Sequence, residues 1–273
     1  MWQKLTAISL LAVSSFLIYG CDPAPEQNTP ATAAQVESDE YANVGAEGFF
    51  TDLRRFVDVE NIQQIGIPRE RGRQDAALGR LNIRYEMIIG HHKDLINGSR
   101  ILDFGSYDGR FTYAALDAGA EYVKGIEINQ DYADQASLNM AELGVERERY
   151  DFIVADLLTY LKTLEAGSYD GAICAGIFYH ITYHVELMRE LERLDLDWVI
   201  MDSAVVQSEA PIVKWSLAPM RLEGIPSLSA IQFIAEQTGF TNEVVELPKN
   251  SSDGMFDYNG GNRYTLTLLR RAK

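Results

Sequence analysis

Acidic residues and glycines follow several apolar runs of this chain, in positions where a ligand could bind. Asp103, Gly105 and Gly109 lie in a turn between an apolar segment at 100–104 and a helical pattern at 111–118. Glycine lets the backbone approach a ligand closely and adopts turn conformations that other residues avoid. The spacing is GxxxG preceded by an acid, whereas a dinucleotide-binding turn reads GxGxxG. A carboxylate at this point predicts a ligand that carries positive charge rather than a pyrophosphate.

Later segments carry a second set of candidate residues. Asp156 follows an apolar run, where it could bind a ligand, cap a helix, or do both. Tyr179 and His180 follow another run, and His180 could accept a proton during a reaction or only shape a pocket. His180 and His184 stand four residues apart, a spacing that can bind a metal on a helix. No carboxylate or third histidine completes that set in the sequence, so no metal is expected.

Strands and helices must alternate to place these residues together. Apolar runs bounded by glycine and polar residues predict strands, and segments with helical periodicity separate them. This alternation predicts an α/β fold with a doubly wound, mostly parallel sheet and helices on both faces. The expected helices are 77–96, 111–118, 130–143, 157–164, 182–194 and 226–238. The seven expected strands are 100–104, 122–128, 151–155, 169–175, 197–201, 244–247 and 264–269.

The run LDFGSYDGRFTYAALDAGAEYVKGIEIN at 102–129 resembles the first two motifs of the class I S-adenosylmethionine (SAM)-dependent methyltransferases. Tyr107 replaces the middle glycine of the family's first motif, as in branches that act on small molecules or on wobble uridine in tRNA. The resemblance implies the family's Rossmann-like fold, with SAM as cofactor. It also implies that the backbone at Gly105, Ser106 and Tyr107 holds the methionine part. Glu127 would then accept hydrogen bonds from the ribose hydroxyls.

Two later segments resemble the family's next motifs in the same order. Asp156 and Leu157 match the positions that contact adenine, and the run YDGAICAG at 169–176 resembles the fourth-strand motif. The resemblance covers 100–202 well. It implies a methyltransferase with Tyr179 and His180 near the leaving methyl group. The complete expected set for the cofactor is Asp103, Gly105, Ser106, Tyr107, Gly109, Glu127, Ile128, Asp156, Leu157 and Ala175.

Charge bears on the substrate class. The formal net charge is −16 and the basic residues are scattered, whereas nucleic-acid binding needs clustered Lys and Arg. We therefore expect a small-molecule acceptor, with a tRNA methyltransferase or a non-catalytic SAM- or nucleoside-binding module as alternatives. The connection 203–225, which contains Trp215, Met220 and Arg221, either lies over the site, as the fold implies, or packs as an ordinary insertion. Tyr258, Asn259 and Arg263 in the loop 254–263 are further candidates for substrate contact.

The first hundred residues show a different pattern. An apolar stretch at 5–19 ends before Cys21, which predicts a signal peptide at 1–20 and resembles a bacterial lipoprotein signal. Residues 21–45 are expected to form a disordered tether and 46–98 a helical extension, before a methyltransferase domain at 99–273. The protein is expected to be anchored to a membrane through lipidated Cys21, with the cytoplasm as the alternative location. His91 and His92 are expected at the surface or in a lid, and Cys174 in the core.

Overall fold

A seven-stranded sheet forms the centre of the protein, in the order β3-β2-β1-β4-β5-β9-β8. The computed structural model describes residues 47–57, 73–218, 221–248 and 255–272. The first five strands pair in parallel, and β9 pairs antiparallel with both β5 and β8. Their bounds are β1 Arg100–Phe104, β2 Tyr122–Glu127, β3 Tyr150–Val154, β4 Gly171–Ala175, β5 Trp198–Ala204, β8 Phe240–Val244 and β9 Arg263–Arg270. The predicted Rossmann-like fold with a mostly parallel sheet is therefore confirmed.

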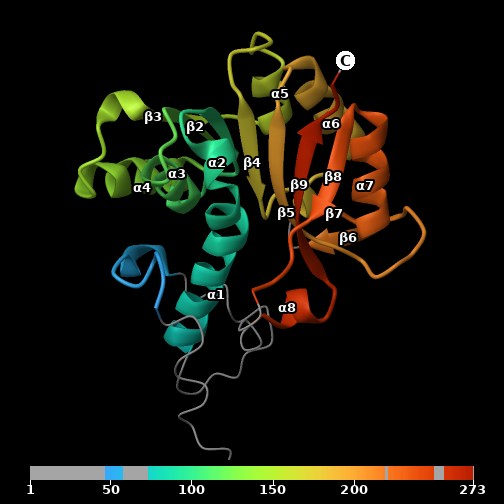
Figure 1. The fold of residues 1–273 in the computed structure, drawn as a ribbon, viewed down its shortest axis with the longest axis horizontal. Helices are drawn as coiled ribbons and strands as arrows, with labels where there is room; N and C mark the ends of the chain where they lie inside the picture. The colour runs from blue at the N-terminus through green and yellow to red at the C-terminus, as the bar shows by residue number, and fades with distance from the viewer. Residues whose placement is uncertain (1–46, 58–72, 219–220, 249–254, 273) are drawn as a thin grey trace, which may run out of the picture. The chain divides into compact units, whose positions relative to one another are not determined.

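Helices cover both faces of the sheet (Figure 1). On one face α5 (Leu157–Leu161), α6 (His184–Arg193) and α7 (Leu228–Gln237) bury apolar residues. On the other face α1 (Arg73–Ile88), α3 (Arg110–Asp117) and α4 (Gln130–Glu142) do the same. Burial of apolar residues on alternating helices and strands stabilises this three-layered arrangement.

Helix α1 packs into the core beside the sheet. Its residues Leu78, Leu81 and Tyr85 belong to the same buried cluster as Phe111 of α3 and Ile200 of β5. The helix was expected to continue to residue 96, but it ends at Ile88, and a turn at Gly90–His92 leads into the short α2 (Lys93–Ile96). Glycine favours such an interruption because it lowers helix propensity.

His92 is buried, although it was expected at the surface or in a lid. Its ring is almost fully buried and hydrogen bonds to Ile88 O (3.1 Å) and Thr267 Oγ1 (2.6 Å). Burial, with the nearby His91, lowers the pKa of His92 to about 4. The imidazole is therefore a neutral structural link between α1 and β9, whereas His91 is exposed as expected.

Strand β8 begins earlier than its apolar pattern suggested. The run 244–247 was predicted as a strand, but β8 spans Phe240–Val244 because Gly239, at φ 82°, ends the preceding segment directly before it. Only alternate residues of β8 face the core, as expected for an edge strand with one solvated face. Val245 and Leu247 instead pack against Ile83 and Met87 of α1.

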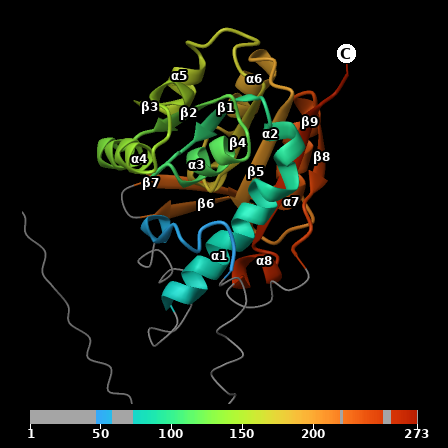
Figure 2. The ribbon, with the colours of Figure 1, turned by 60° about the vertical axis from the view of Figure 1, so that its left-hand side comes forward.

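A β-hairpin occupies the connection that was expected to lie over the site. Strands β6 (Val213–Ala218) and β7 (Arg221–Pro226) pair antiparallel and are separate from the main sheet (Figure 2). The Gly224 N–H donates to Ile181 O at 3.1 Å, so β7 lies against the segment that follows β4. Gly224 and Pro226 interrupt the apolar pattern of β7, and both residue types weaken the prediction of a strand.

The predicted signal peptide, the tether and Cys21 lie outside the described residues. Within the described part of the chain, no helix is both long enough and apolar enough to cross a membrane.

Candidate functional site

The glycine turn after β1 adopts the conformations expected of it. Gly105 has φ 64° and Gly109 has φ 81°, both in the left-handed region that glycine occupies without strain. A Cβ at Gly109 would lie 3.1 Å from the Phe152 ring and 3.2 Å from Ala136 Cβ, so the turn also packs tightly against its neighbours. Tyr107 occupies the left-handed region as well, at φ 52°, at a cost of about 1–2 kcal/mol.

Glu127 holds that strained residue in place. Tyr107 N–H donates to Glu127 Oε2 at 3.0 Å, and Asn129 N–H donates to Glu127 Oε1 at 2.9 Å. The β1–β2 register, with Phe104 opposite Ile126, brings the two strand ends together. Because each carboxylate oxygen has two lone pairs, both oxygens can still accept a bond from a ligand hydroxyl. The geometry thus joins the two sequence motifs through a single carboxylate.

Asp103 is a buried acid that forms no ion pair with a Lys, Arg or His side chain of the described residues. Only 2% of its surface is exposed, and Thr112 Oγ1 donates to Asp103 Oδ2 at 2.7 Å. Burial, reinforced by the negative charges of Glu127 and Asp108, raises the pKa of Asp103 to about 7, against the opposing effect of the Thr112 bond. A bound cation would favour the ionised carboxylate, so the site suits a ligand that carries positive charge.

The neighbouring residues of the turn complete this site. Ser106 Oγ is buried and has no hydrogen-bond partner among the described residues. Asp108, in contrast, is paired with Arg110 through a bond of 2.6 Å. Among the described residues, no Lys, Arg or His side chain forms an ion pair with the two carboxyls beside the turn, Asp103 in β1 and Glu127 at the end of β2. The turn itself adds an unsatisfied hydroxyl. This set of acid and hydroxyl groups fits a polar, positively charged cofactor such as SAM.

The residues expected around an adenine ring lie at the ends of β2 and β3. Ile128 is exposed by 73% directly after Glu127, and Ala155 N–H donates to Glu127 O at 3.0 Å. Asp156 is exposed and caps α5, because the Thr159 N–H donates to its Oδ1 at 2.9 Å. Leu157 is largely buried in the core. The helix-capping interpretation of Asp156 is thus confirmed, and its contact with a cofactor stays a prediction.

Tyr179 and His180 follow β4 in a short 3₁₀ turn, η5 (Phe178–His180). Ala175 ends β4 half-buried, and Gly176 at φ 88° turns the chain toward η5. The Tyr179 and His180 rings lie 4.0 Å apart between centroids. Both predicted catalytic side chains therefore stand beside the carboxyl end of the parallel sheet, where ligands of such folds bind.

A carboxylate that sequence reasoning missed contacts His180. Glu223 of β7 lies with Oε1 2.6 Å from His180 Nδ1, and both side chains are mostly buried. Such a carboxylate orients the imidazole and stabilises the imidazolium that forms when the ring accepts a proton. Glu223 is 43 residues from His180, so no local spacing could reveal the pair.

His184 has a structural role. Its Nε2 bonds to Phe178 O at 3.0 Å, and burial lowers its pKa. Among the described residues, no group of three or more His, Cys, Asp or Glu side chains is arranged to hold a metal ion. Cys174 is a free, buried thiol whose pKa is raised by burial.

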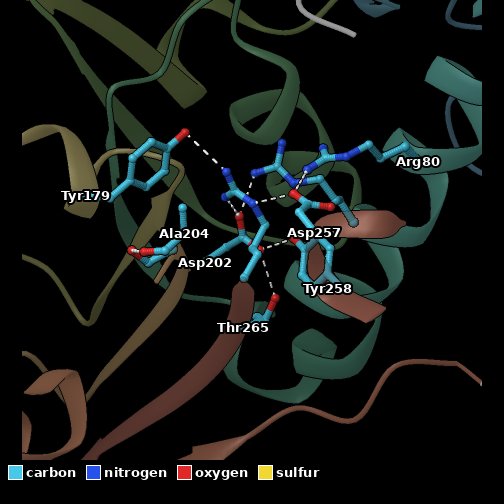
Figure 3. A network of polar contacts seen from close by, with 10 residues as sticks. Arg80, Tyr179, Asp202, Ala204, Asp257, Tyr258 and Thr265 are labelled. Carbon is cyan, nitrogen blue, oxygen red and sulfur yellow. Dashed lines mark hydrogen bonds and ion pairs between the residues drawn. The ribbon is translucent and has the colours of Figure 1, made fainter. Parts of the chain in front are cut away.

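An ionic cluster surrounds Asp202 at the end of β5, and we call it the arginine cluster (Figure 3). Asp202 Oδ1 accepts bonds from Arg84 and Arg263, each at 2.8 Å, and Oδ2 accepts from Thr265 at 3.0 Å and from Tyr258. Burial opposes ionisation of Asp202, but the two guanidinium groups outweigh it and hold the pKa of Asp202 well below its usual range.

The cluster extends to the candidate catalytic residues. Arg263 also binds Asp257 Oδ2 at 2.9 Å, and Arg80 binds the same oxygen at 2.5 Å. Arg263 then donates to Tyr179 Oη at 3.2 Å. Tyr258 and Arg263, which were candidates for substrate contact, both bind Asp202, and their contact with a substrate stays a prediction. No local pattern in the sequence singled out Arg84 or Asp202.

Residues 101–194, about a third of the chain, match a family model described as "Methyltransferase domain". The tRNA U34 carboxymethyltransferase of Idiomarina loihiensis is 27% identical over 160 residues, which cover 56% of this chain and 48% of that protein. The chain thus aligns with about half the length of that relative.

Solved structures share the architecture. A [4+2]-cyclase, SpnF, superposes with a TM-score of 0.56 at 15% identity, over 72% of this chain and 84% of its own. The SAM-bound magnesium protoporphyrin IX methyltransferase of Synechocystis PCC 6803 superposes with a TM-score of 0.52 at 17% identity, over 81% and 96%. The fold is that of the Rossmann-like methyltransferases. Likeness at this identity establishes the fold alone, and the reaction has to be argued from the site.

Proposed function

We propose that this protein is a SAM-dependent methyltransferase that acts on a small-molecule acceptor. The observation that carries the proposal is the coupling of the glycine turn to Glu127, beside the uncompensated buried acid Asp103. These residues lie in the first two motifs, inside the segment 101–194 that matches the methyltransferase family model. A ligand with an ammonium, a sulfonium and a ribose matches all three features. Its positive charges suit the turn and Asp103, and its ribose hydroxyls suit Glu127.

Each predicted cofactor residue has a role in binding. Asp103 balances the positive charge of the methionine part, and the turn from Gly105 to Tyr107 presents its backbone to that part. Glu127 accepts bonds from the ribose hydroxyls, and Ile128 offers an exposed apolar surface to the adenine ring. Asp156, Leu157 and Ala175 complete the site at the ends of β3 and β4. When bound, SAM supplies an electrophilic methyl group on its sulfonium.

His180 and Glu223 supply the proton-transfer chemistry. The acceptor nucleophile loses a proton as it attacks, and an imidazole backed by a carboxylate can take that proton. The Tyr179 ring packs beside His180 and is held in place by its hydrogen bond from Arg263. The remaining contribution to rate comes from positioning, which converts a bimolecular reaction into an effectively unimolecular one.

The charge of the chain supports a small-molecule acceptor. A net charge of −16 repels polyanions and slows their association at low salt. A tRNA acceptor is the second candidate, because the curated relative is named a tRNA U34 carboxymethyltransferase. A third is a binding module without methyl transfer, since the fold is shared with a protein named a cyclase.

Two measurements test the proposal in sequence. Calorimetric titration with SAM and S-adenosylhomocysteine must show saturable binding, and absence of binding to both refutes the cofactor assignment. Cell extract is then incubated with the protein and methyl-labelled SAM, and the small-molecule, RNA and protein fractions are counted. Label in the small-molecule fraction supports the proposal, label in tRNA selects the second candidate, and no label with intact binding selects the third.

We further propose that Cys21 is lipidated and anchors the chain to a membrane. The apolar stretch before Cys21 and its resemblance to a lipoprotein signal support this proposal. A Cys21→Ala variant should move from the membrane to the soluble fraction. Identical fractionation of variant and wild type would leave the cytoplasm as the alternative location.

A further inference from the structure

The arginine cluster lies apart from most of the residues expected to bind the cofactor. Except for Ala175 at the end of β4, the expected cofactor residues lie at the ends of β1, β2 and β3, whereas the cluster joins α1, β5, α8 (Phe256–Asn259) and β9. In the sheet order, β4 separates the two groups. The cluster reaches Tyr179 in the segment after β4. A group bound at the cluster would therefore belong to the acceptor rather than to SAM.

The charges within the cluster do not balance. Arg80, Arg84 and Arg263 face the carboxylates of Asp202 and Asp257, which leaves one positive charge in a chain of net charge −16. All five side chains are largely buried, with Asp202 completely so. An uncompensated charge removed from water is costly, so a counter-charge would stabilise the cluster. A single negative charge completes it.

The guanidinium groups also have unused donors. Arg84 Nε and Arg80 Nε are buried and have no hydrogen-bond partner among the described residues, and Asp257 Oδ1 likewise lacks one. Arg84 uses its Nη2 for Asp202. A Cβ built on Gly176 would lie 3.7 Å from that Nη2, an ordinary van der Waals distance, so the end of β4 lies directly beside the Arg84 guanidinium. The planar fork of an arginine matches a carboxylate through two parallel hydrogen bonds.

We propose that the arginine cluster, with Arg84 as its main donor, binds a carboxylate group of the small-molecule acceptor. That the bound carboxylate belongs to a methyl acceptor rests on the proposed function, whereas the anion site itself does not depend on it. A monoanion neutralises the cluster, whereas the dianion of a phosphate monoester would overcompensate it. The carboxylate would orient the acceptor so that its nucleophile lies near His180, between the cluster and the cofactor residues.

Side-chain NMR of the wild-type protein tests the site without a known acceptor. The Nε–H resonances of ¹⁵N-labelled arginines are followed during titration with sodium acetate, in the absence and in the presence of saturating S-adenosylhomocysteine. Acetamide is the neutral control of the same shape, and sodium chloride controls for ionic strength. The Arg84 resonance is assigned by its loss in the Arg84→Lys variant, which keeps the charge facing Asp202.

A saturable shift of the Arg84 resonance by acetate alone supports the proposal. An equal response to chloride or acetamide, or a shift that never saturates, overturns it. Arg84→Gln should weaken acetate binding at least tenfold while affinity for S-adenosylhomocysteine stays within twofold. Arg100→Gln is the matched control, because Arg100 lies half-exposed at the opposite end of β1 and should leave both affinities unchanged.

The two proposals fail separately in this design. Acetate saturation without S-adenosylhomocysteine binding refutes the methyltransferase assignment and leaves the anion site standing. Binding of S-adenosylhomocysteine without saturation by acetate refutes the anion site and leaves the methyltransferase assignment standing. If Arg84→Gln does not fold, the wild-type titration alone decides.

Discussion

Replacement of Asp103 by asparagine should make the protein more stable while making cofactor binding weaker. The pKa of this acid is about 7 in the folded protein and 3.8 in its ordinary state, mainly because of burial. That difference corresponds to roughly 4 kcal/mol at most. Because the folded state binds the proton more tightly, the free energy of unfolding falls as pH rises from 3.8 to about 7. Asparagine keeps an oxygen for Thr112 and removes the charge, so the variant should gain up to about 4 kcal/mol at pH 8.

Cofactor binding should respond to pH in the opposite way. If SAM binds the ionised carboxylate, binding must release the proton that Asp103 holds below pH 7. With a pKa of about 7, proton release should be about 0.9 per SAM bound at pH 6 and about 0.1 at pH 8. The dissociation constant should then rise roughly tenfold between pH 8 and pH 6 from this group alone.

Calorimetry in two buffers with different ionisation enthalpies measures proton release directly, and urea denaturation measures stability. The amino group of SAM titrates in the same range, but it does so equally with wild type and Asp103→Asn, so the difference between them isolates Asp103. The same proton release in both proteins would refute the assignment of Asp103 to the cofactor. A variant less stable than wild type at pH 8 would refute the burial argument itself.

Three other substitutions test separate parts of the structure. Glu127→Ala should weaken SAM binding by about 1.5–3 kcal/mol, the range for a hydrogen bond to a charged group, and calorimetry that shows unchanged affinity removes Glu127 from the site. Glu223→Gln should lower the rate of labelled-methyl transfer by about tenfold or more, measured in the extract fraction that the wild type labels, with the affinity for S-adenosylhomocysteine preserved. An unaffected rate means that His180 only shapes the pocket. His92 has a pKa of about 4, below its ordinary 6.5, so its contribution to stability, roughly 3 kcal/mol at most, should be present above pH 6.5 and lost as pH falls toward 4. His92→Gln should flatten that part of the stability profile in urea denaturation, and an unchanged profile assigns the acid sensitivity to other groups.

Local patterns in the sequence were enough to predict the mostly parallel sheet and the turn at 103–109, while the cofactor contacts of that turn stay a prediction. Strands alternating with helices allow few topologies, and the turn at 103–109 lies directly after its strand, so its glycines adopted the expected left-handed conformations. Local spacing was enough there because turn, strand and helix are consecutive in the chain. The edge strand β8 was expected too late in the chain, because half-solvated strands carry a weak apolar pattern, and the hairpin β6–β7 was missed.

The residues proposed to contact the acceptor come together through tertiary contacts alone. Arg84, Asp202 and Arg263 come from α1, β5 and β9, and 118 residues separate the first two. Glu223 meets His180 only because β7 folds back against the segment after β4. Ion pairs at such separations leave no periodicity in the sequence, because their partners meet through the topology of the sheet, with β9 antiparallel beside β5, and not through proximity in the chain. The same cause buried His92, whose partner Thr267 lies 175 residues away.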